Sequence, residues 1–358
     1  MIKEKIHYSR DELKIFQQIQ LEVHNYLNKC PSGNYASTRF FIKSSLIAII
    51  WTCLLILLYT PSSYIELYLY YSILGIFNTL IFLNILHDAA HQAIFKNRKS
   101  NDFVFEWLNL LGGNSYVWKL RHLSSHHPYP NIPGRDVDIG QSDVVRLNSA
   151  TSFKFFHHYQ PYYMPIIYLT YTLFWVFFRD FKDFVKGDII RGNKKPYPLK
   201  EWLKLLMFKF IYFSLFLVLP YLILPFSFSE IFLGFVCMHV FQSILSAMGL
   251  LTAHVNEHSN FPLPDKEGNM MDCWAIHQIK STNDFGTNSA LINYAFGGFN
   301  FHVAHHLFPN MSHTHYKKIT PIIQKVIERN GLEYQEMGMF EALLSHWYLL
   351  KKYSKIVT

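Results

Sequence analysis

Four long, mostly apolar stretches constrain this chain more than any other feature. They cover residues 44–60, 64–86, 205–225 and 230–253. An α-helix rises about 1.5 Å per residue, so about 20 residues cross a hydrocarbon core roughly 30 Å thick. The turns within each pair are short and contain no Lys or Arg. The sequence therefore predicts two membrane-spanning helical hairpins.

A fifth apolar stretch, residues 161–178, is followed by a strongly basic segment, 179–204. That segment holds eight basic residues: Arg179, Lys182, Lys186, Arg191, Lys194, Lys195, Lys200 and Lys204. Basic loops stay on the cytoplasmic side, so a helix at 161–178 that crossed the membrane would place this segment outside. We therefore interpret 161–178 as an interfacial or half-inserted helix.

The predicted fold is an all-α integral membrane protein with four transmembrane helices, interfacial helices and a cytoplasmic helical cap. The cap comprises residues 87–160 and 254–358, so this multi-pass protein has both ends on the cytoplasmic side. With no linker or repeat in the sequence, residues 1–358 are expected to form one domain. Its core would run from about 40 to 320, with cytoplasmic extensions at 1–40 and 321–358.

Composition agrees with burial in lipid and excludes several other classes. Only 16% of the 358 residues are charged, against roughly 25% in ordinary soluble domains. The net charge of +8 comes without an arginine-rich helix, so we expect no nucleic-acid partner. The four cysteines form no CxxC pair, which argues against a zinc knuckle or a disulfide framework.

The nineteen histidines are clustered. HDAAH (87–91) ends the second predicted span, HLSSHH (122–127) and HVAHH (302–306) lie in the cap, and His254 and His258 follow the last span. Helix residues three or four apart share a face, so such imidazoles can chelate one ion. Two doubled boxes on one membrane side predict two metal ions, although imidazole alone suits iron, zinc and copper.

Some neighbouring residues have less certain roles. Four carboxylates adjoin the boxes and are expected either to orient ligand imidazoles or to be solvated: Asp88, Asp136, Asp138 and Glu257. His239, within the last span, is interpreted as a hydrogen-bonded structural residue. His277 is expected near the site, and His346 at the surface.

The motifs resemble those of the membrane fatty acid desaturases, and within them the front-end and linoleoyl-CoA desaturase group. The likeness runs from about residue 84 to 316. It rests on HDAAH, LLGGNSYVWKLRHLSSHHPYPNIPGRDVDI, AHVNE, WAIHQIKSTNDFG and GGFNFHVAHHLFPNMSHTHY. The resemblance implies a centre of two iron ions, O2 as co-substrate and removal of two hydrogens from an acyl chain, with no catalytic residue beyond the metal centre.

Carried over residue by residue, the resemblance implies nine metal ligands: His87, His91, His122, His126, His127, His254, His302, His305 and His306. His258 is a further candidate. Many front-end enzymes have glutamine where this chain has His302, so the position of the double bond stays open. Many also carry a fused cytochrome b5 domain with an HPGG motif, which this sequence lacks.

The resemblance leaves several alternatives. The substrate would be a fatty acyl-CoA or an acyl-lipid in the membrane, and electrons would come from a separate ferredoxin or cytochrome b5-type protein. A hydroxylase or acetylenase could use the same scaffold. A membrane metal transporter is a rival from another class, but transport sites lie near the bilayer midplane, whereas these histidines gather at helix ends.

Overall fold

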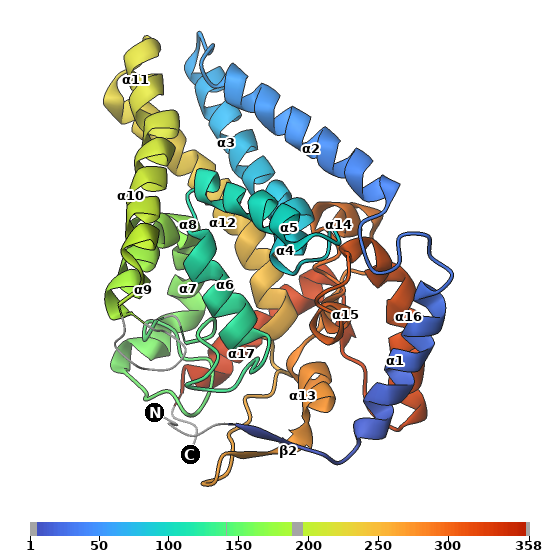
Figure 1. Ribbon diagram of the computed structural model, residues 1–358. Coiled ribbons are helices and arrows are strands. Elements are labelled where there is room, and N and C mark those ends of the chain that lie inside the picture. The colour runs from blue at the N-terminus through green and yellow to red at the C-terminus, as the bar shows by residue number, and fades with distance from the viewer. Residues whose placement is uncertain (1–5, 141, 188–195, 356–358) are drawn as a thin grey trace.

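Four long helices form the upper half of the computed structural model, which describes residues 6–140, 142–187 and 196–355 (Figure 1). They run over Thr38–Leu57, Tyr64–Ala90, Leu199–Ile223 and Phe228–His254, and each is long and apolar enough to cross a membrane. The four predicted spans are thereby confirmed as helices. The first is α2 and the last is α12 (Phe228–His254).

The second and third spans are continuous but not uniformly α-helical. The second comprises α3 (Tyr64–Ile81), a π-helical turn η1 (Phe82–Leu86) and α4 (His87–Ala90). The third comprises α10 (Leu199–Phe213), a π-helical turn η6 (Ser214–Val218) and α11 (Leu219–Ile223).

Helices α3 and α12 pack against each other through two glycines. A Cβ on Gly75 would lie 2.0 Å from the carbonyl oxygen of Met238, and one on Gly234 would lie 2.3 Å from the Tyr71 ring. Only glycine permits backbones to approach this closely. The two helices that end nearest the histidines are therefore held in close contact.

The lower half of the molecule is a cap of short helices and two very small parallel sheets, β1–β2 and β3–β4. From the first cap segment it takes α5 (Arg98–Phe105), η2 (Glu106–Leu111), α6 (Ser115–Arg121), η3 (His122–His126) and η4 (Phe155–Tyr159). From the second it takes β2 (Asn269–Cys273), α13 (Trp274–Ser281), β3 (Asp284–Phe285), α14 (Ala290–Ala295), α15 (His302–Leu307), η7 (His313–His315), α16 (Tyr316–Arg329), β4 (Glu336–Met337) and α17 (Met339–Tyr353).

The two ends of the chain pack into this cap. Near the N-terminus, β1 (His7–Ser9) pairs with β2, and α1 (Leu13–Leu27) packs on α16 around Ile19 and Ile323. Near the C-terminus, α17 packs on α12. The prediction that His346 lies at the surface is wrong: it is buried, and its ring contacts the Tyr168 hydroxyl and the Val255 carbonyl at 2.9 and 2.7 Å.

The fifth apolar stretch is broken into short helices and is not among the candidate spans. It forms α7 (Gln160–Tyr168) and α8 (Tyr171–Phe174), then continues through a π-helical turn η5 (Trp175–Arg179) into α9 (Asp180–Lys186). Its polar end is tied to the cap and to α10, because Asp183 pairs with Arg121 and Asp180 with Lys209, at 2.9 and 2.8 Å. Residues 188–195, which include three of the eight basic residues, lie outside the described parts of the chain.

Candidate metal centre

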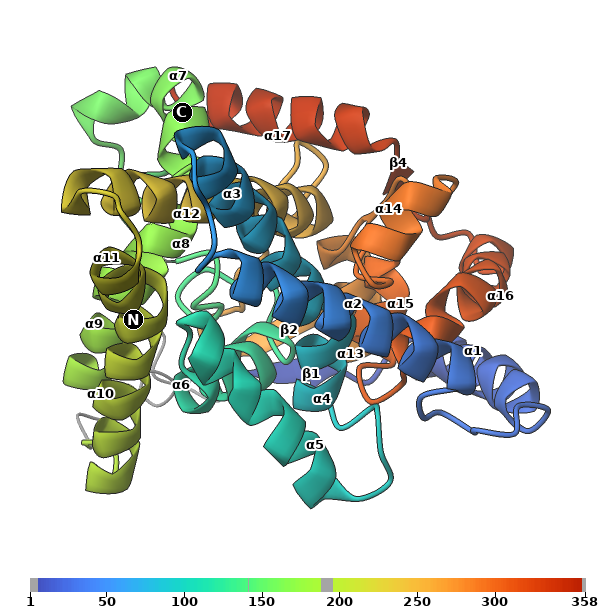
Figure 2. The same ribbon diagram turned by 90° about the horizontal axis from the view of Figure 1, so that it is seen from above.

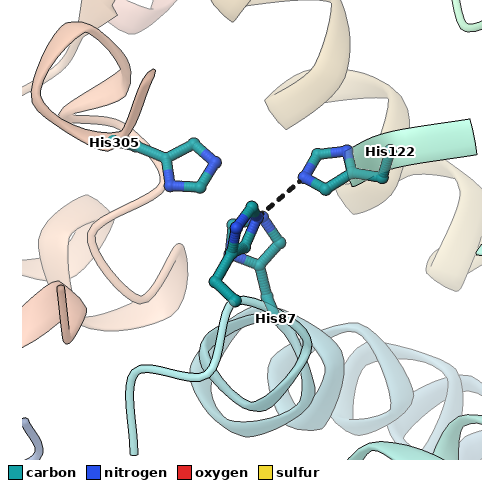
Figure 3. A group of neighbouring side chains, drawn as sticks. His87, His122 and His305 are labelled. Carbon is teal, nitrogen blue, oxygen red and sulfur yellow. Dashed lines mark hydrogen bonds between the residues drawn. The ribbon is translucent and has the colours of Figure 1, made fainter. Parts of the chain in front are cut away.

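All nine histidines of the predicted ligand set meet where α3 and α12 enter the cap. His87 begins α4 and His91 directly follows it; His122 and His126 lie on η3, with His127 next; His254 ends α12. The third box, His302, His305 and His306, lies on α15. Figure 3 shows His87, His122 and His305 pointing toward one another from three separate segments.

The nine side chains form overlapping groups whose nitrogens lie within 4.8 Å of one another. One group contains His87, His91, His122 and His305; another contains His126, His254, His302 and His306. His127 joins His305 and His306 in a third group that links the first two. All nine are buried. The structure thus brings the whole predicted set together as two adjoining four-histidine groups with His127 between them.

A π-helical turn explains how the second box presents three imidazoles. In an α-helix, residues five apart point about 140° away from each other. In η3 the His127 amide donates to the His122 carbonyl, one residue further back than in an α-helix, and this brings the two Nε2 atoms to 3.0 Å. The i,i+5 pair therefore faces one site, which α-helical spacing does not predict.

The contact between His254 and His302 shows that this site suits a cation. Nδ1 of His254 donates to the Ser281 carbonyl, and Nδ1 of His302 donates to the Phe299 carbonyl, both at 3.0 Å. Burial lowers the pKa of His302 far below its usual value, so that ring is neutral. Each Nε2 then carries a lone pair, yet the two atoms lie 2.6 Å apart. Facing lone pairs at this distance repel unless a cation lies between them.

Other nitrogen–nitrogen distances agree with shared ions. Three further Nε2–Nε2 pairs are 3.0 Å apart: His91–His122, His122–His127 and His126–His254. Imidazole nitrogens that held one ion would each lie about 2.1 Å from it, so short nitrogen–nitrogen distances would be expected among them. In addition, Nε2 of His87, His305 and His306 is buried without a hydrogen-bond partner in the described residues. Metal coordination would satisfy these atoms.

The outer nitrogens of three more ligand candidates are held by side chains. Nδ1 of His126 donates to Asp136 at 2.9 Å, and Nδ1 of His306 lies 2.8 Å from the Gln278 amide oxygen. Nδ1 of His305 lies 3.2 Å from the Tyr316 hydroxyl. Such contacts fix the ring orientation and leave Nε2 free for a metal. Sequence reasoning overlooked Gln278 and Tyr316, although Gln278 stands beside His277 in a motif already singled out.

Asp136 is the carboxylate most directly linked to the site. Burial on its own would raise the pKa of Asp136, but the His126 ring and the Asn131 amide outweigh burial and hold that pKa below its usual value. Asp136 is therefore ionised, and its charge favours the Nδ1–H form of His126. The sequence alone could not distinguish it from the other three carboxylates.

The remaining polar candidates contact other partners. Asp88 accepts from His313, and Asp138 pairs with Arg121. Glu257 and His258 are exposed and lie beside each other.

The other two histidines named with the boxes are buried but outside the ligand groups. His277 contacts the Pro130 carbonyl at 2.9 Å. His239 lies between Thr172 and Tyr212 at 2.9 Å from each hydroxyl, so the prediction that it is a hydrogen-bonded residue is confirmed.

A cavity of ≈ 400 Å³ reaches the histidines from between the helices. His87, His122, His126 and His254 form part of its wall, and most other lining residues are apolar or aromatic. They come mainly from η1, η2, α6, α7, α8, η5 and α12 and from the cap loop around residues 139–147. The cavity can therefore place an apolar chain against the four-histidine groups while excluding water.

A membrane-embedded helical bundle with a buried polyhistidine centre is the class of protein that this fold and site define. Residues 63–338 match the family model described as "Fatty acid desaturase". The chain belongs to the fatty acid desaturase family.

Curated relatives bear similar names. The chain is 32% identical over 294 residues to an "sn-1 linoleoyl-lipid 6-desaturase" of Arthrospira platensis, covering 79% of this chain and 76% of the relative. It is 33% identical over 266 residues to a protein of the same name from Synechocystis sp., covering 74% of each. An "Acyl-lipid (8-3)-desaturase" of Physcomitrium patens is 29% identical over 282 residues, covering 78% of this chain and 58% of the relative. The protein is accordingly a fatty acyl desaturase, an oxidoreductase of lipid metabolism.

Proposed function

We propose that the nine histidines hold two iron ions and that this centre desaturates an acyl chain lying in the cavity. The observation that carries the proposal is the paired arrangement of two buried four-histidine groups whose Nε2 atoms converge. Iron with O2 would supply the oxidising power to remove two hydrogens from unactivated carbon, which no side chain can do.

The protein's own residues position both reactants. Asp136, Gln278 and the Ser281 and Phe299 carbonyls hold their imidazoles in one tautomer, so the nitrogens need no reorientation to bind metal. Phe82, Leu83 and Trp118 line the cavity next to His87 and His122 and exclude water from that part of the wall.

The names of the relatives support a more specific substrate. Two are called linoleoyl-lipid 6-desaturases and a third an acyl-lipid desaturase. For this chain we propose an unsaturated acyl-lipid as substrate, with the new double bond on the carboxyl side of an existing one. Electrons would come from a separate ferredoxin or cytochrome b5-type protein.

The cap, and with it the centre, is proposed to face the cytoplasm. Apart from Glu66 and Glu230 near the helix starts, the turns that end the two hairpins away from the cap carry no charge. Among the described basic residues after α8, Arg179 and Lys204 instead contact Asp138 and Glu106 of the cap. The whole chain is proposed to act as one domain, because α1 and α17 pack into the cap that holds the histidines.

The test combines metal analysis with product analysis. The purified protein should contain two iron ions per chain with nitrogen-rich Mössbauer parameters. A host of known lipid composition that expresses the gene should gain one new unsaturated fatty acid, identified by mass spectrometry. One ion per chain would contradict the ligand assignment, and a hydroxylated or acetylenic product would contradict the proposed reaction outcome.

A further inference from the structure

Three residues have two properties expected at an opening: they line the cavity, and more than a third of the surface of each is accessible. They are Ile167 on α7, Phe174 on α8 and Leu250 on α12, with exposed fractions of 39%, 37% and 39%. Helix α12 packs against both α7 and α8. The three residues are therefore the candidate rim of an opening between these helices.

This rim lies at the depth of the membrane and not in the cap. Leu250 is four residues before the end of the last candidate span, about 6 Å along the helix axis from His254. An opening at that depth faces the lipid tails and headgroups of one leaflet.

Helices α7 and α17, which pack against each other and against α12, also present exposed apolar rows. Tyr162 and Ile166 on α7 are 72% and 67% exposed, and Phe340, Leu344 and Tyr348 on α17 follow one another at every fourth position, also exposed. Both rows repeat at helical spacing, so each forms one face of its helix.

The two helices are also joined to each other. The Trp347 indole donates to the Pro161 carbonyl, and the Gln160 amide donates to the Leu350 carbonyl. Figure 2 shows α17 lying along one edge of the molecule and reaching α7. Apolar and aromatic rows on helices at the ends of spans are typical of contact with a membrane interface.

Neither the three rim residues nor the other described lining residues include a Lys or Arg. A nucleotide-bearing thioester whose acyl chain entered here would need cationic partners for its phosphates at this rim. An ester-linked lipid needs none, because its headgroup stays at the interface.

We propose that the acyl chain of an intact membrane lipid enters sideways through this rim, which we call the lateral portal (Ile167, Phe174 and Leu250). The α7–α17 face lies in the same leaflet and carries the headgroup region. The inference rests on the proposed acyl-lipid desaturation. Entry through the lateral portal explains how a double bond can form near the carboxyl end of an esterified chain. Because the portal lies one helical turn from His254, the ester that remains at the portal stays close to the metal site.

The portal is not the cavity's only contact with the exterior. Val144, in the cap loop after residue 140, also lines the cavity and is 40% exposed. Entry beside Val144 would suit a carrier that arrives from the aqueous side. The experiment must therefore compare the two openings.

Single cysteines placed in a background without the four native cysteines allow this comparison. Leu250→Cys and Val144→Cys probe the two openings, and Leu233→Cys is the matched control. Leu233 lies on the same helix as Leu250, is 50% exposed and does not line the cavity. Each full-length variant, in proteoliposomes with its lipid substrate, is treated with a bulky membrane-permeant methanethiosulfonate that a reductant removes.

The labelled Leu250→Cys protein should lose desaturation of the lipid and regain it on reduction, while labelled Leu233→Cys keeps its activity and labelled Val144→Cys loses less than labelled Leu250→Cys. Unchanged turnover after labelling at 250, or loss only after labelling at 144, would overturn the lateral portal.

A second measurement does not depend on activity. A phosphatidyl lipid with a photoreactive acyl chain should crosslink to cavity-lining residues of α7, α8 and α12, and labelling at 250 should abolish these adducts. Absence of adducts in the cavity would overturn the portal. If adducts form as expected but unlabelled protein makes no unsaturated product, the proposed function fails and the portal stands.

Discussion

Replacing Asp136 with asparagine tests how far the surroundings of the metal site, beyond the ligands themselves, determine activity. Asp136 accepts hydrogen bonds from Nδ1 of His126 at 2.9 Å, from the Asn131 amide at 2.9 Å and from the Asp138 amide at 2.8 Å. His126 and the Asn131 amide share one carboxylate oxygen, Oδ2, whereas the Asp138 amide uses Oδ1. An asparagine has the same shape but only one oxygen, so its NH2 group must face either His126 and the Asn131 amide or the Asp138 amide. In either orientation the hydrogen bond from His126 to a charged acceptor is lost.

Two estimates of the effect of Asp136→Asn agree. A hydrogen bond to a charged group contributes about 1.5–3 kcal/mol. Loss of a carboxylate that orients a metal-bound histidine typically costs about 10–100-fold in metal affinity or activity, which corresponds to about 1.4–2.7 kcal/mol. We therefore expect iron content to fall at the group that contains His126, and product formation to fall by about 10–100-fold.

The assay measures iron per chain and the fatty acid profile of the same preparation. Glu257→Gln is the control, because this carboxylate adjoins the last span but is exposed, and its described side-chain partners are His258 and Ser345 and none of the nine clustered histidines. It should leave both quantities unchanged. If Asp136→Asn binds two irons and forms product at the normal rate, the reasoning from the His126 contact is refuted.

Four further outcomes are expected. His254→Ala should abolish the unsaturated product in the fatty acid profile while membrane insertion persists. His258→Ala should retain activity, because the native His258 ring is exposed. The reverse pattern would contradict the ligand assignment. Gly75→Ala should lower the midpoint of thermal unfolding in detergent. The added methyl would lie 2.0 Å from a carbonyl oxygen of α12, and overpacking costs about 1–3 kcal/mol. An unchanged midpoint would show that α3 and α12 can separate freely. Chelation of iron should also lower the midpoint, reversibly, because the facing lone pairs lose their cation; no shift would mean that protons relieve the repulsion. A membrane-impermeant thiol reagent should label cysteines at Ser62 and Lys266 from opposite sides; labelling from one side would refute the hairpin topology.

Much of the fold could be predicted because lipid imposes simple rules on sequence. A helix must satisfy its own backbone, so a long apolar run predicts both its secondary structure and its location. The interpretation of 161–178 as a helix that does not cross the membrane followed from the basic residues after it. The structure divides this stretch into short helices, and it adds that Asp180 and Asp183 form ion pairs that hold α9 beside the cap and α10.

The parts that sequence could not predict depend on contacts between distant segments. His346 lies on an amphipathic helix near the end of the chain and looks like a surface residue until α17 is packed against α7 and α12. Likewise, only the folded structure shows that Asp136 contacts a ligand while Asp88 contacts His313. Short polar side chains near a motif all look alike until the chain around them is placed.

The π-helical turn at His122–His126 makes residue count, and not only residue identity, a requirement of this centre. Such a turn is what a single inserted residue produces in an α-helix. Ser124, within it, is exposed and makes no side-chain contact that the site uses. Many substitutions at this position should therefore be tolerated. If the segment closed as an ordinary α-helix at its present length, His127 would point about 140° away from His122. Deleting Ser124 would instead make the two histidines an i,i+4 pair, which shares one face of an α-helix. The length of this box and its π-helical turn are thus matched, and a change in one requires a compensating change in the other.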